Sequence, residues 1–403
     1  MTSETLLATG TWTTAGTLPA ARSWLGQQDG PVVVKKDSKE MVLLAGGADS
    51  SGTAVNECFL FDPNAATPAW AVADKKMVSA RRMHTVTVID SGKKVLVTGG
   101  ATGSFQPAAA GLNTAEIYDI AAGTWTATAT TMKQGRWGHT ATVLPDDKVL
   151  ITGGSTQRVG NSIRTLSSAE IYDVKNDTWA DAVPMLDARS GHSAFAVNNQ
   201  VLVVGGGTAV GPQQDTALAY CEIYDPTSKG WTSTASLAAP RRGHHAVQLT
   251  DGKVVVVGGA APGSSAGGTF QPFSLATVER YDPGPGTWSP LNAMGIGRSS
   301  HRVVEVKAGK LLVAGGTDSS ASGGYQNVNG DAGYQSATLL TSDWAAEAPL
   351  TTGRWGFGAV ALSGDRVLVV GGVVQSGSAT AVQGVTVLTN TAEFYKLPAG
   401  VTP

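Results

Sequence analysis

The chain has 403 residues, of which 29 are Lys or Arg and 31 are Asp or Glu, so its formal net charge is −2. This near balance excludes a strongly basic nucleic-acid binder and a polybasic membrane-binding protein. Hydrophobic residues make up 42% of the chain, which is enough for a large folded core. No apolar run approaches the roughly 18 residues that span a membrane, and the first residues lack a secretory signal pattern, so we expect a cytoplasmic protein.

Three sequence marks recur seven times along the chain, which indicates a repeat architecture. A Gly-Gly pair ends an apolar run every 52 to 57 residues, a Trp recurs in step, and an Arg follows each Trp by ten or eleven residues. The pairs begin at Gly46, Gly99, Gly153, Gly205, Gly258, Gly315 and Gly371. The tryptophans are Trp12, Trp70, Trp125, Trp179, Trp231, Trp288 and Trp344. The arginines are Arg22, Arg81, Arg136, Arg189, Arg241, Arg298 and Arg354. In five repeats a His follows the Arg by three residues, namely His84, His139, His192, His244 and His301.

Each period has room for four short strands. In chain order, examples are expected at residues 115–119, 124–127, 139–144 and 148–152. These segments are rich in Val, Ile, Leu and Thr, and they are separated by Gly, Asp, Asn and Pro. Because no segment shows a clear apolar stripe at the helical period, we expect little helix.

The Gly-Gly pair, the Tyr-Asp segment and the Trp at this period resemble the kelch repeat across essentially the whole chain. The resemblance implies an all-β fold, a seven-bladed β-propeller with one four-stranded sheet per blade, and we expect residues 1–403 to form one such domain. The last repeat has a third strand near residues 391–395 but no Trp strand after it, whereas Trp12 has no repeat before it. We therefore expect the N-terminal strand, about residues 10–15, to complete the C-terminal blade and remove an exposed sheet edge.

The repeated arginines are expected to be structural, each paired with a Glu on the third strand of its blade, because a residue present in every blade more often holds the blade than binds one ligand. The expected partners are Glu116, Glu170, Glu222, Glu279 and Glu393. Two repeats depart from this pattern. Phe59 stands at the Glu position of the first repeat, and the sixth has no matching Glu, so Arg22 and Arg298 are the arginines expected to be free for a ligand.

Long connections between the second and third strands are expected on one face, together with the connections between blades. They cover residues 48–55, 101–114, 155–168, 207–219, 260–276, 317–336 and 373–390. Loop length indicates where function is added to a scaffold, and the kelch resemblance implies binding at this face. Aromatic, amide and Arg side chains there form a plausible recognition surface. The candidate ligand-binding residues are Arg22, Trp24, Phe105, Gln106, Trp137, Phe270, Gln271, Arg298, Tyr325, Tyr334 and Trp355.

Two functions remain open. The first is a recognition propeller, expected to be a monomer, that binds a small molecule or a protein partner on the loop face. Within the 403 residues no BTB domain of the eukaryotic kelch adaptors is present, so we expect no adaptor role of that kind. The alternative is a metal-independent enzyme of the isomerase, cyclase or lyase type with its pocket at the propeller mouth. Its catalytic candidates are Tyr325, Tyr334, His301 and Arg298.

No cofactor or metal is expected for either function. The repeated histidines occur one per blade, so their spacing does not bring them together. Copper-radical oxidases of kelch type need a Cys crosslinked to a Tyr and two metal-binding histidines, and Cys58 instead falls in an expected third strand. The two cysteines, Cys58 and Cys221, cannot form a disulfide framework.

Overall fold

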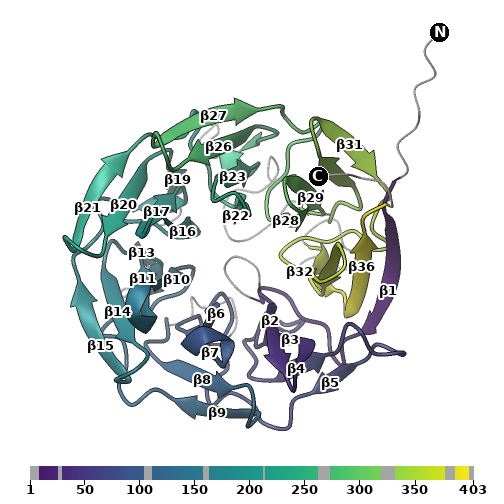
Figure 1. The fold of residues 1–403 in the computed structure, drawn as a ribbon, viewed down its shortest axis with the longest axis horizontal. Coiled ribbons are helices and arrows are strands. Elements are labelled where there is room, and N and C mark those ends of the chain that lie inside the picture. Colours follow the sequence, from purple (N-terminus) through teal and green to yellow (C-terminus); the bar gives the residue numbers. More distant parts are fainter. Residues whose placement is uncertain are drawn as a thin grey trace.

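The repeats fold into seven antiparallel sheets of four strands, arranged as a ring (Figure 1). The computed structural model describes residues 9–25, 30–103, 111–157, 163–211, 214–261, 273–318, 332–376 and 386–398. The seven-bladed propeller predicted from the repeats is confirmed. The helical elements within these ranges are two short 3-10 turns, η1 (Asp90–Gly92) and η2 (Pro145–Asp147). No helix of the described residues is long and apolar enough to cross a membrane.

Blades 1 to 6 have their strands in chain order from the channel to the outside, whereas in blade 7 the N-terminal strand is outermost (Figure 1). Blade 1 contains β2 (Val32–Lys36), β3 (Lys39–Ala45), β4 (Cys58–Phe61) and β5 (Trp70–Val72). Blade 2 contains β6 (Thr85–Ile89), β7 (Lys94–Thr98), β8 (Ala115–Asp119) and β9 (Thr124–Ala127). Blade 3 contains β10 (Thr140–Leu144), β11 (Lys148–Thr152), β14 (Ala169–Asp173) and β15 (Thr178–Ala182). Blade 4 contains β16 (Ser193–Val197), β17 (Gln200–Val204), β20 (Cys221–Asp225) and β21 (Gly230–Thr234).

Blades 5 and 6 follow the same order, and blade 7 is completed by the N-terminal strand. Blade 5 contains β22 (His245–Gln248), β23 (Val254–Val257), β26 (Val278–Asp282) and β27 (Thr287–Leu291). Blade 6 contains β28 (Arg302–Lys307), β29 (Lys310–Ala314), β30 (Ala337–Leu340) and β31 (Trp344–Glu347). Blade 7 contains β32 (Gly358–Leu362), β33 (Arg366–Val370), β36 (Thr391–Lys396) and β1 (Thr11–Thr17).

Four of the long connections contain short strand pairs that were not predicted from the sequence. Their polar, Gly-rich sequences lack the alternation that indicates a strand. The pairs are β12 (Ser155–Gln157) with β13 (Ile163–Thr165), β18 (Gly207–Gly211) with β19 (Gln214–Ala217), β24 (Ala260–Ala261) with β25 (Phe273–Ser274), and β34 (Val373–Gln375) with β35 (Val387–Leu388).

The hydrophobic core lies between the blades. Between blades 2 and 3, for example, Leu96 of β7 clusters with Val149 and Ile151 of β11 and with Tyr172 of β14. Because both faces of each blade are covered by neighbours, the second strand is buried on both sides. This accounts for the unbroken apolar runs before each Gly-Gly pair.

The repeated Trp residues lie on the outer strands at the margin of the core. Trp70 and Trp231 are buried within core clusters, and the other five are partly exposed and pack against such clusters. In six blades the indole packs on an aromatic residue of the third strand, as Trp125 does on Tyr118 with ring centroids 5.0 Å apart. Trp231 Nε1 also donates to the Val183 carbonyl of the preceding blade at 2.8 Å, so the indole ring bridges two blades.

The N-terminal strand closes the ring, as predicted. Strand β1 pairs antiparallel with β36, with Trp12 opposite Tyr395 and Thr14 opposite Glu393. Trp12 Nε1 donates to the Ala348 carbonyl at 2.8 Å, which ties blade 7 to blade 6. The chain ends are thereby joined in one sheet, and β36 has no free edge.

Deletion of residues 1–17 is expected to lower the thermal unfolding midpoint and to promote self-association, because β36 then exposes its unpaired backbone groups. Differential scanning calorimetry and size-exclusion chromatography measure the two effects. A chain lacking only residues 1–8 keeps β1 and serves as the control. Equal stability and equal size for the two truncated chains would show that β1 does not hold the ring closed.

Candidate functional site

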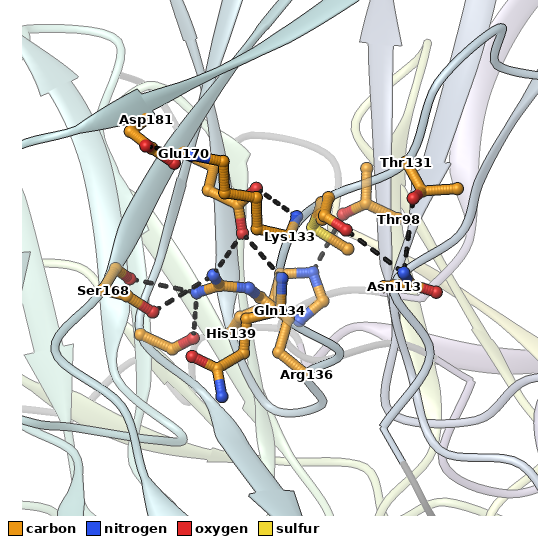
Figure 2. A network of polar contacts seen from close by, with 12 residues as sticks. Thr98, Asn113, Thr131, Lys133, Gln134, Arg136, His139, Ser168, Glu170 and Asp181 are labelled. Carbon is orange, nitrogen blue, oxygen red and sulfur yellow. Dashed lines mark hydrogen bonds and ion pairs between the residues drawn. The ribbon is translucent and has the colours of Figure 1, made fainter.

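Below the loop face of blades 2 to 7, a repeated Arg side chain ties together the base of a long loop. Figure 2 shows the arrangement for Arg136. Its Nη1 donates to the Gly153 carbonyl at 2.8 Å and to the Ser168 carbonyl at 3.0 Å, which are the two ends of the loop between β11 and β14. Its Nη2 donates to Glu170 Oε1 at 2.7 Å.

The Glu carboxylate fixes the connection that leads in from the previous blade. Glu170 accepts hydrogen bonds from the backbone N–H groups of Lys133, at 2.7 Å, and Gln134, at 3.4 Å (Figure 2). These residues stand three and two positions before Arg136. The carboxylate thus has three donors and no unbalanced charge, which is what makes burial of both groups tolerable.

All five predicted Arg–Glu pairs are present, with Nη2–Oε1 distances of 2.5 to 2.7 Å and side chains at most 6% exposed. The pairs are Arg81–Glu116, Arg136–Glu170, Arg189–Glu222, Arg241–Glu279 and Arg354–Glu393. The structural role expected for these arginines is confirmed. They do not present a ring of free cations to a ligand.

The Gly-Gly pairs let the backbone pass against the next blade's Arg. Gly153 and Gly154 have φ values of 61° and 94°, and Gly154 N donates to the Arg189 carbonyl at 2.8 Å. A Cβ on Gly153 would lie 2.4 Å from the same carbonyl oxygen. No other residue fits both the left-handed backbone and this close approach.

Replacement of Glu170 by Ala is expected to lower the free energy of unfolding by about 3–5 kcal/mol, because the Arg136 charge is left buried without its partner. Urea unfolding measures the change. The double variant Arg136→Met with Glu170→Leu is expected to lose less than Glu170→Ala alone. The exposed pair of Lys133 with Asp181 is the control, and Asp181→Ala should cost less than about 1 kcal/mol. Similar losses for Glu170→Ala and Asp181→Ala would contradict the structural role.

The repeated histidines are buried packing groups between blades. His139 Nε2 lies 2.9 Å from Thr98 Oγ1 of blade 2, and His192 Nε2 lies 2.9 Å from Thr140 Oγ1 of blade 3. Burial, together with the neighbouring Arg charge, lowers the pKa of His84 to about 3 and holds the pKa of His139 well below its usual value. These rings are therefore neutral in the folded protein.

Stability is expected to fall as the pH drops below about 6.5, where histidines of the unfolded chain take up protons that the buried rings exclude. For His84 the window runs from the unfolded value of 6.5 to the folded value of about 3. Within it the free energy of unfolding should decrease by about 1.4 kcal/mol per pH unit for this residue. The variant His84→Phe, which copies Phe357 at the equivalent place in blade 7, should show a shallower dependence between about pH 6.5 and pH 4.5 in urea unfolding. If the free energy of unfolding changes equally with pH in His84→Phe and in the unaltered chain, His84 does not cause the pH dependence.

The expectation that Arg22 is free for a ligand is wrong. Its Nη2 lies 3.3 Å from Glu57 Oε2, and its guanidinium carbon lies 5.6 Å from the centre of the Phe59 ring. Phe59 takes the usual Glu position, and a carboxylate from two residues earlier in the chain replaces the missing one. Glu57 also pairs with Lys76 at 3.2 Å, so this carboxylate is shared.

Arg298 lacks a carboxylate partner within the described residues, as predicted. Its Nη1 donates to the carbonyls of Gly315, at 2.8 Å, and Ser336, at 3.1 Å, and its Nη2 donates to Ser336 Oγ at 3.0 Å. Thr338 occupies the Glu position, opposite Val313 in the sheet. The Tyr334 ring centre lies 5.6 Å from the guanidinium carbon, so these two predicted residues are brought together. Burial lowers the pKa of Arg298 to about 10, and its side chain remains cationic at neutral pH.

A belt of backbone hydrogen bonds surrounds the mouth of the channel. The residue two positions after each repeated Arg has a left-handed backbone, and six hydrogen bonds join these residues from blade to blade. The bonds are Trp24 N to Gly356 O, Met83 N to Trp24 O, Gly138 N to Met83 O, Gly191 N to Gly138 O, Ser300 N to Gly243 O and Gly356 N to Ser300 O. Their lengths are 2.8 to 3.2 Å.

Three blades carry a side chain at this belt position, where the other four have Gly. Trp24, Met83 and Ser300 have φ values of 51° to 54°. Side chains in this region are uncommon, and strained backbone concentrates at functional sites. Trp24 was among the residues predicted from the sequence, whereas Met83 and Ser300 were missed. The signal was present, because Gly stands two residues after the Arg in four repeats and these three positions break that pattern.

An aromatic pair lies at this mouth. The Trp24 and Trp355 ring centroids are 5.6 Å apart at an interplanar angle of 80°, and both residues are partly exposed. Trp137 is only 5% exposed, and its backbone pairs with Ser155. His301 is 1% exposed and lies below the surface. Five other predicted residues lie outside the described ranges, namely Phe105, Gln106, Phe270, Gln271 and Tyr325.

The channel below the mouth holds a cavity of about 420 Å³. Innermost strands of six blades line it, including Val32 of β2, Thr85 of β6, Thr140 of β10 and Val303 of β28. A cavity of this size falls within the range of small-ligand pockets, roughly 300–1,000 Å³. Its lining is mainly Val, Thr and Ala with few charged groups, so the chemistry that could select a ligand lies at the mouth.

Cys58 lies in the third strand β4, as expected, and burial raises its pKa to about 12. A thiol held protonated in this way is unreactive. Among the described residues, no group of three or more His, Cys, Asp and Glu side chains could hold a metal ion.

Known structures with this architecture have diverse sequences. The structure of YjhT matches with a TM-score of 0.59 and 15% identity, over 82% of this chain and 98% of that one. The structure of a fungal alcohol oxidase of the AA5 family in complex with copper matches with a TM-score of 0.69 and 16% identity, over 98% of this chain and 79% of that one. At these identities the similarity shows the fold alone.

The sequence relatives are longer than the regions that match this chain. Kelch-like protein 25 of Xenopus tropicalis is 28% identical over 230 residues, which cover 56% of this chain and 35% of the relative. Alpha-scruin of Limulus polyphemus is 29% identical over 171 residues, 42% of this chain and 18% of the relative. The match thus spans about a third or less of these relatives. The family model of the KLHDC2/KLHL20/DRC7 kelch-repeats domain matches residues 31–259, and the kelch motif matches residues 241–295. The chain therefore belongs to the kelch-repeat family.

Proposed function

We propose that this chain is a recognition propeller that binds a protein segment or a small molecule at the mouth of its channel, on the face of the long loops. The observation that carries the proposal is the Trp24–Trp355 pair at a left-handed backbone position. Trp24 has a φ of 51°, a backbone conformation that Gly adopts without strain but that destabilises a residue with a side chain. The partly exposed indole at this position therefore lowers the stability of the folded protein. Large aromatic anchors of this kind dominate binding energies at recognition surfaces.

The surroundings of the pair support recognition. Met83 stands next along the belt, and its flexible thioether suits a surface that adapts to a partner. Its neighbour Arg82 is only 3% exposed, whereas Arg242, at the equivalent place in blade 5, is partly exposed. Tryptophan, methionine and arginine are the residue types enriched in interfaces. On the same face, the partly exposed Tyr334 is a further candidate contact, together with the candidates that lie outside the described residues, whereas Arg298 is only 1% exposed.

Fewer observations support the alternative, a metal-independent enzyme. His301 is buried, and burial together with the Arg298 charge holds its pKa well below the usual value, so it is a poor proton acceptor at neutral pH. Tyr334 remains near Arg298, but within the described ranges Arg298 has no carboxylate partner that could act as a base. We therefore favour binding over catalysis.

The variant Trp24→Gly separates binding from folding. Because the equivalent residue is Gly in four blades, the variant is expected to keep or raise the unfolding midpoint while it removes the indole. Thermal-shift measurements against a metabolite panel, and affinity capture from a host lysate followed by mass spectrometry, give the binding readouts.

A ligand found with the unaltered chain should bind Trp24→Gly at least about tenfold more weakly, since anchors of this kind contribute about 2 kcal/mol or more. The control is Gly191, the belt residue of blade 4, replaced by Ala, which alters the belt backbone but not the aromatic pair. Unchanged binding to Trp24→Gly would overturn the proposed site.

A further inference from the structure

Blade 6 keeps every element of the Arg–Glu arrangement except the Glu. Arg298 Nη1 bonds to the Gly315 and Ser336 carbonyls at 2.8 and 3.1 Å, which matches Arg136 on its own loop at 2.8 and 3.0 Å. Nη2 of each arginine donates to a Ser hydroxyl, at 3.0 Å in blade 6 and 3.2 Å in blade 3. The guanidinium is therefore held in the same place in both blades.

The connection before Arg298 is also held as in the Glu-containing blades. Met294 N donates to the Ala276 carbonyl at 2.9 Å, and Arg298 N donates to the Leu275 carbonyl at 3.2 Å. In blade 3 the equivalent bonds are Met132 N to Asn113 O, 3.0 Å, and Arg136 N to Leu112 O, 3.1 Å. The N–H groups of Gly295 and Ile296 thus correspond to those of Lys133 and Gln134, which bind Glu170.

Thr338 stands where the Glu side chain would start. It pairs with Val313, as Glu170 pairs with Ile151, but its side chain ends at the γ position, so it lacks the carboxylate carbon and two oxygens of Glu, a group the size of formate. Its buried hydroxyl oxygen has no hydrogen-bond partner in the described part of the chain. Arg298 itself is 1% exposed, so a buried cation and a buried hydroxyl face the position that a carboxylate takes in five other blades.

We infer that Arg298 Nη2, the N–H groups of Gly295 and Ile296 and the Thr338 hydroxyl form a binding site for a small free monocarboxylate, here called the blade-6 cradle. The ligand class follows from the donors, because the same three N–H donors hold a carboxylate in the Glu-containing blades. The ligand's size follows from the side-chain difference between Glu and Thr, which favours acetate or formate over larger acids.

The two residues that supply the backbone donors of the cradle lie at the protein surface. Ile296 is 51% exposed, and a Cβ built on Gly295 would have no atom within 4 Å. The carboxylate would lie just below these residues, with its charge balanced by Arg298. This site is separate from the aromatic pair at the mouth and does not depend on the proposed recognition function.

The experiment compares thermal unfolding in sodium acetate, formate, butyrate and chloride at equal ionic strength, with ¹³C line broadening of labelled acetate as a direct binding readout. The unaltered chain should show a saturable rise in unfolding midpoint with acetate and formate. At about ten times the acetate Kd the ratio of folded to unfolded protein should rise about elevenfold. Butyrate and chloride should give smaller shifts.

Two variants test the site itself. Thr338→Glu supplies the carboxylate from the chain, so it should be more stable without acetate and should lose the acetate response. Glu170→Thr builds the same cradle in blade 3 and should be less stable but partly rescued by acetate.

Lack of an acetate response in the unaltered chain would overturn the proposal, as would a response that Thr338→Glu retains. An equal response to chloride would overturn the assignment to carboxylates. If Glu170→Thr does not fold, comparing the acetate response of the unaltered chain with that of Thr338→Glu still tests the proposed site.

Discussion

The buried Arg–Glu pair at the base of the long loop, present in five blades, is the interaction on which the rest of the propeller depends. One guanidinium fixes both ends of a loop, and one carboxylate fixes the connection from the preceding blade. Burying either charge alone carries a large desolvation cost, which the pair offsets in the five blades that have both groups. With the loop ends fixed in this way, the sequence between them is free to vary in length without disturbing the sheet.

Blades 1 and 6 show two ways in which the chain departs from this rule. In blade 1 a carboxylate from another position, Glu57, reaches Arg22, and it remains 29% exposed rather than fully buried. In blade 6 the protein keeps the cation and its backbone partners and gives up the carboxylate, with Thr338 in its place. The first departure substitutes one internal partner for another. The second departure leaves the positive charge of Arg298 without a carboxylate partner among the described side chains.

Much of this architecture could be predicted because the same sequence marks recur in seven repeats. The blade number, the strands of each blade, the closing strand at Trp12 and the five Arg–Glu pairs all follow from marks repeated in register. Single-copy features were harder to predict. Glu57 pairs with Arg22 from a position two residues before the one where the other blades have their Glu. The strand pairs within the long loops have no alternating pattern of apolar and polar residues. Met83 and Ser300 could have been found only by asking which repeats lack a Gly whose backbone conformation the others require.

The aromatic pair at the mouth depends on a relation between distant parts of the chain. Trp24 lies between β1 and β2, whereas Trp355 lies just before β32, and they meet because blades 1 and 7 are neighbours in the closed ring. A surface of this kind exists only in the completed ring. The proposed recognition surface, which includes the Trp24–Trp355 pair, therefore requires a closed ring, because each of the two blades contributes only one of the tryptophans.

Closure by β1 also has a consequence for the order of folding during synthesis. The first strand made pairs with the last one made, Thr11 with Lys396, so this sheet cannot form until almost the whole chain has been synthesised. Blades 1 to 6 are each built from consecutive strands and can form as the chain emerges. Blade 7 cannot be completed until β36 is made, and until then β1 has no strand to pair with. Contacts between such distant residues are slow to form. The nascent protein is thus most prone to aggregation just before its final strand arrives, when six finished blades still lack the seventh.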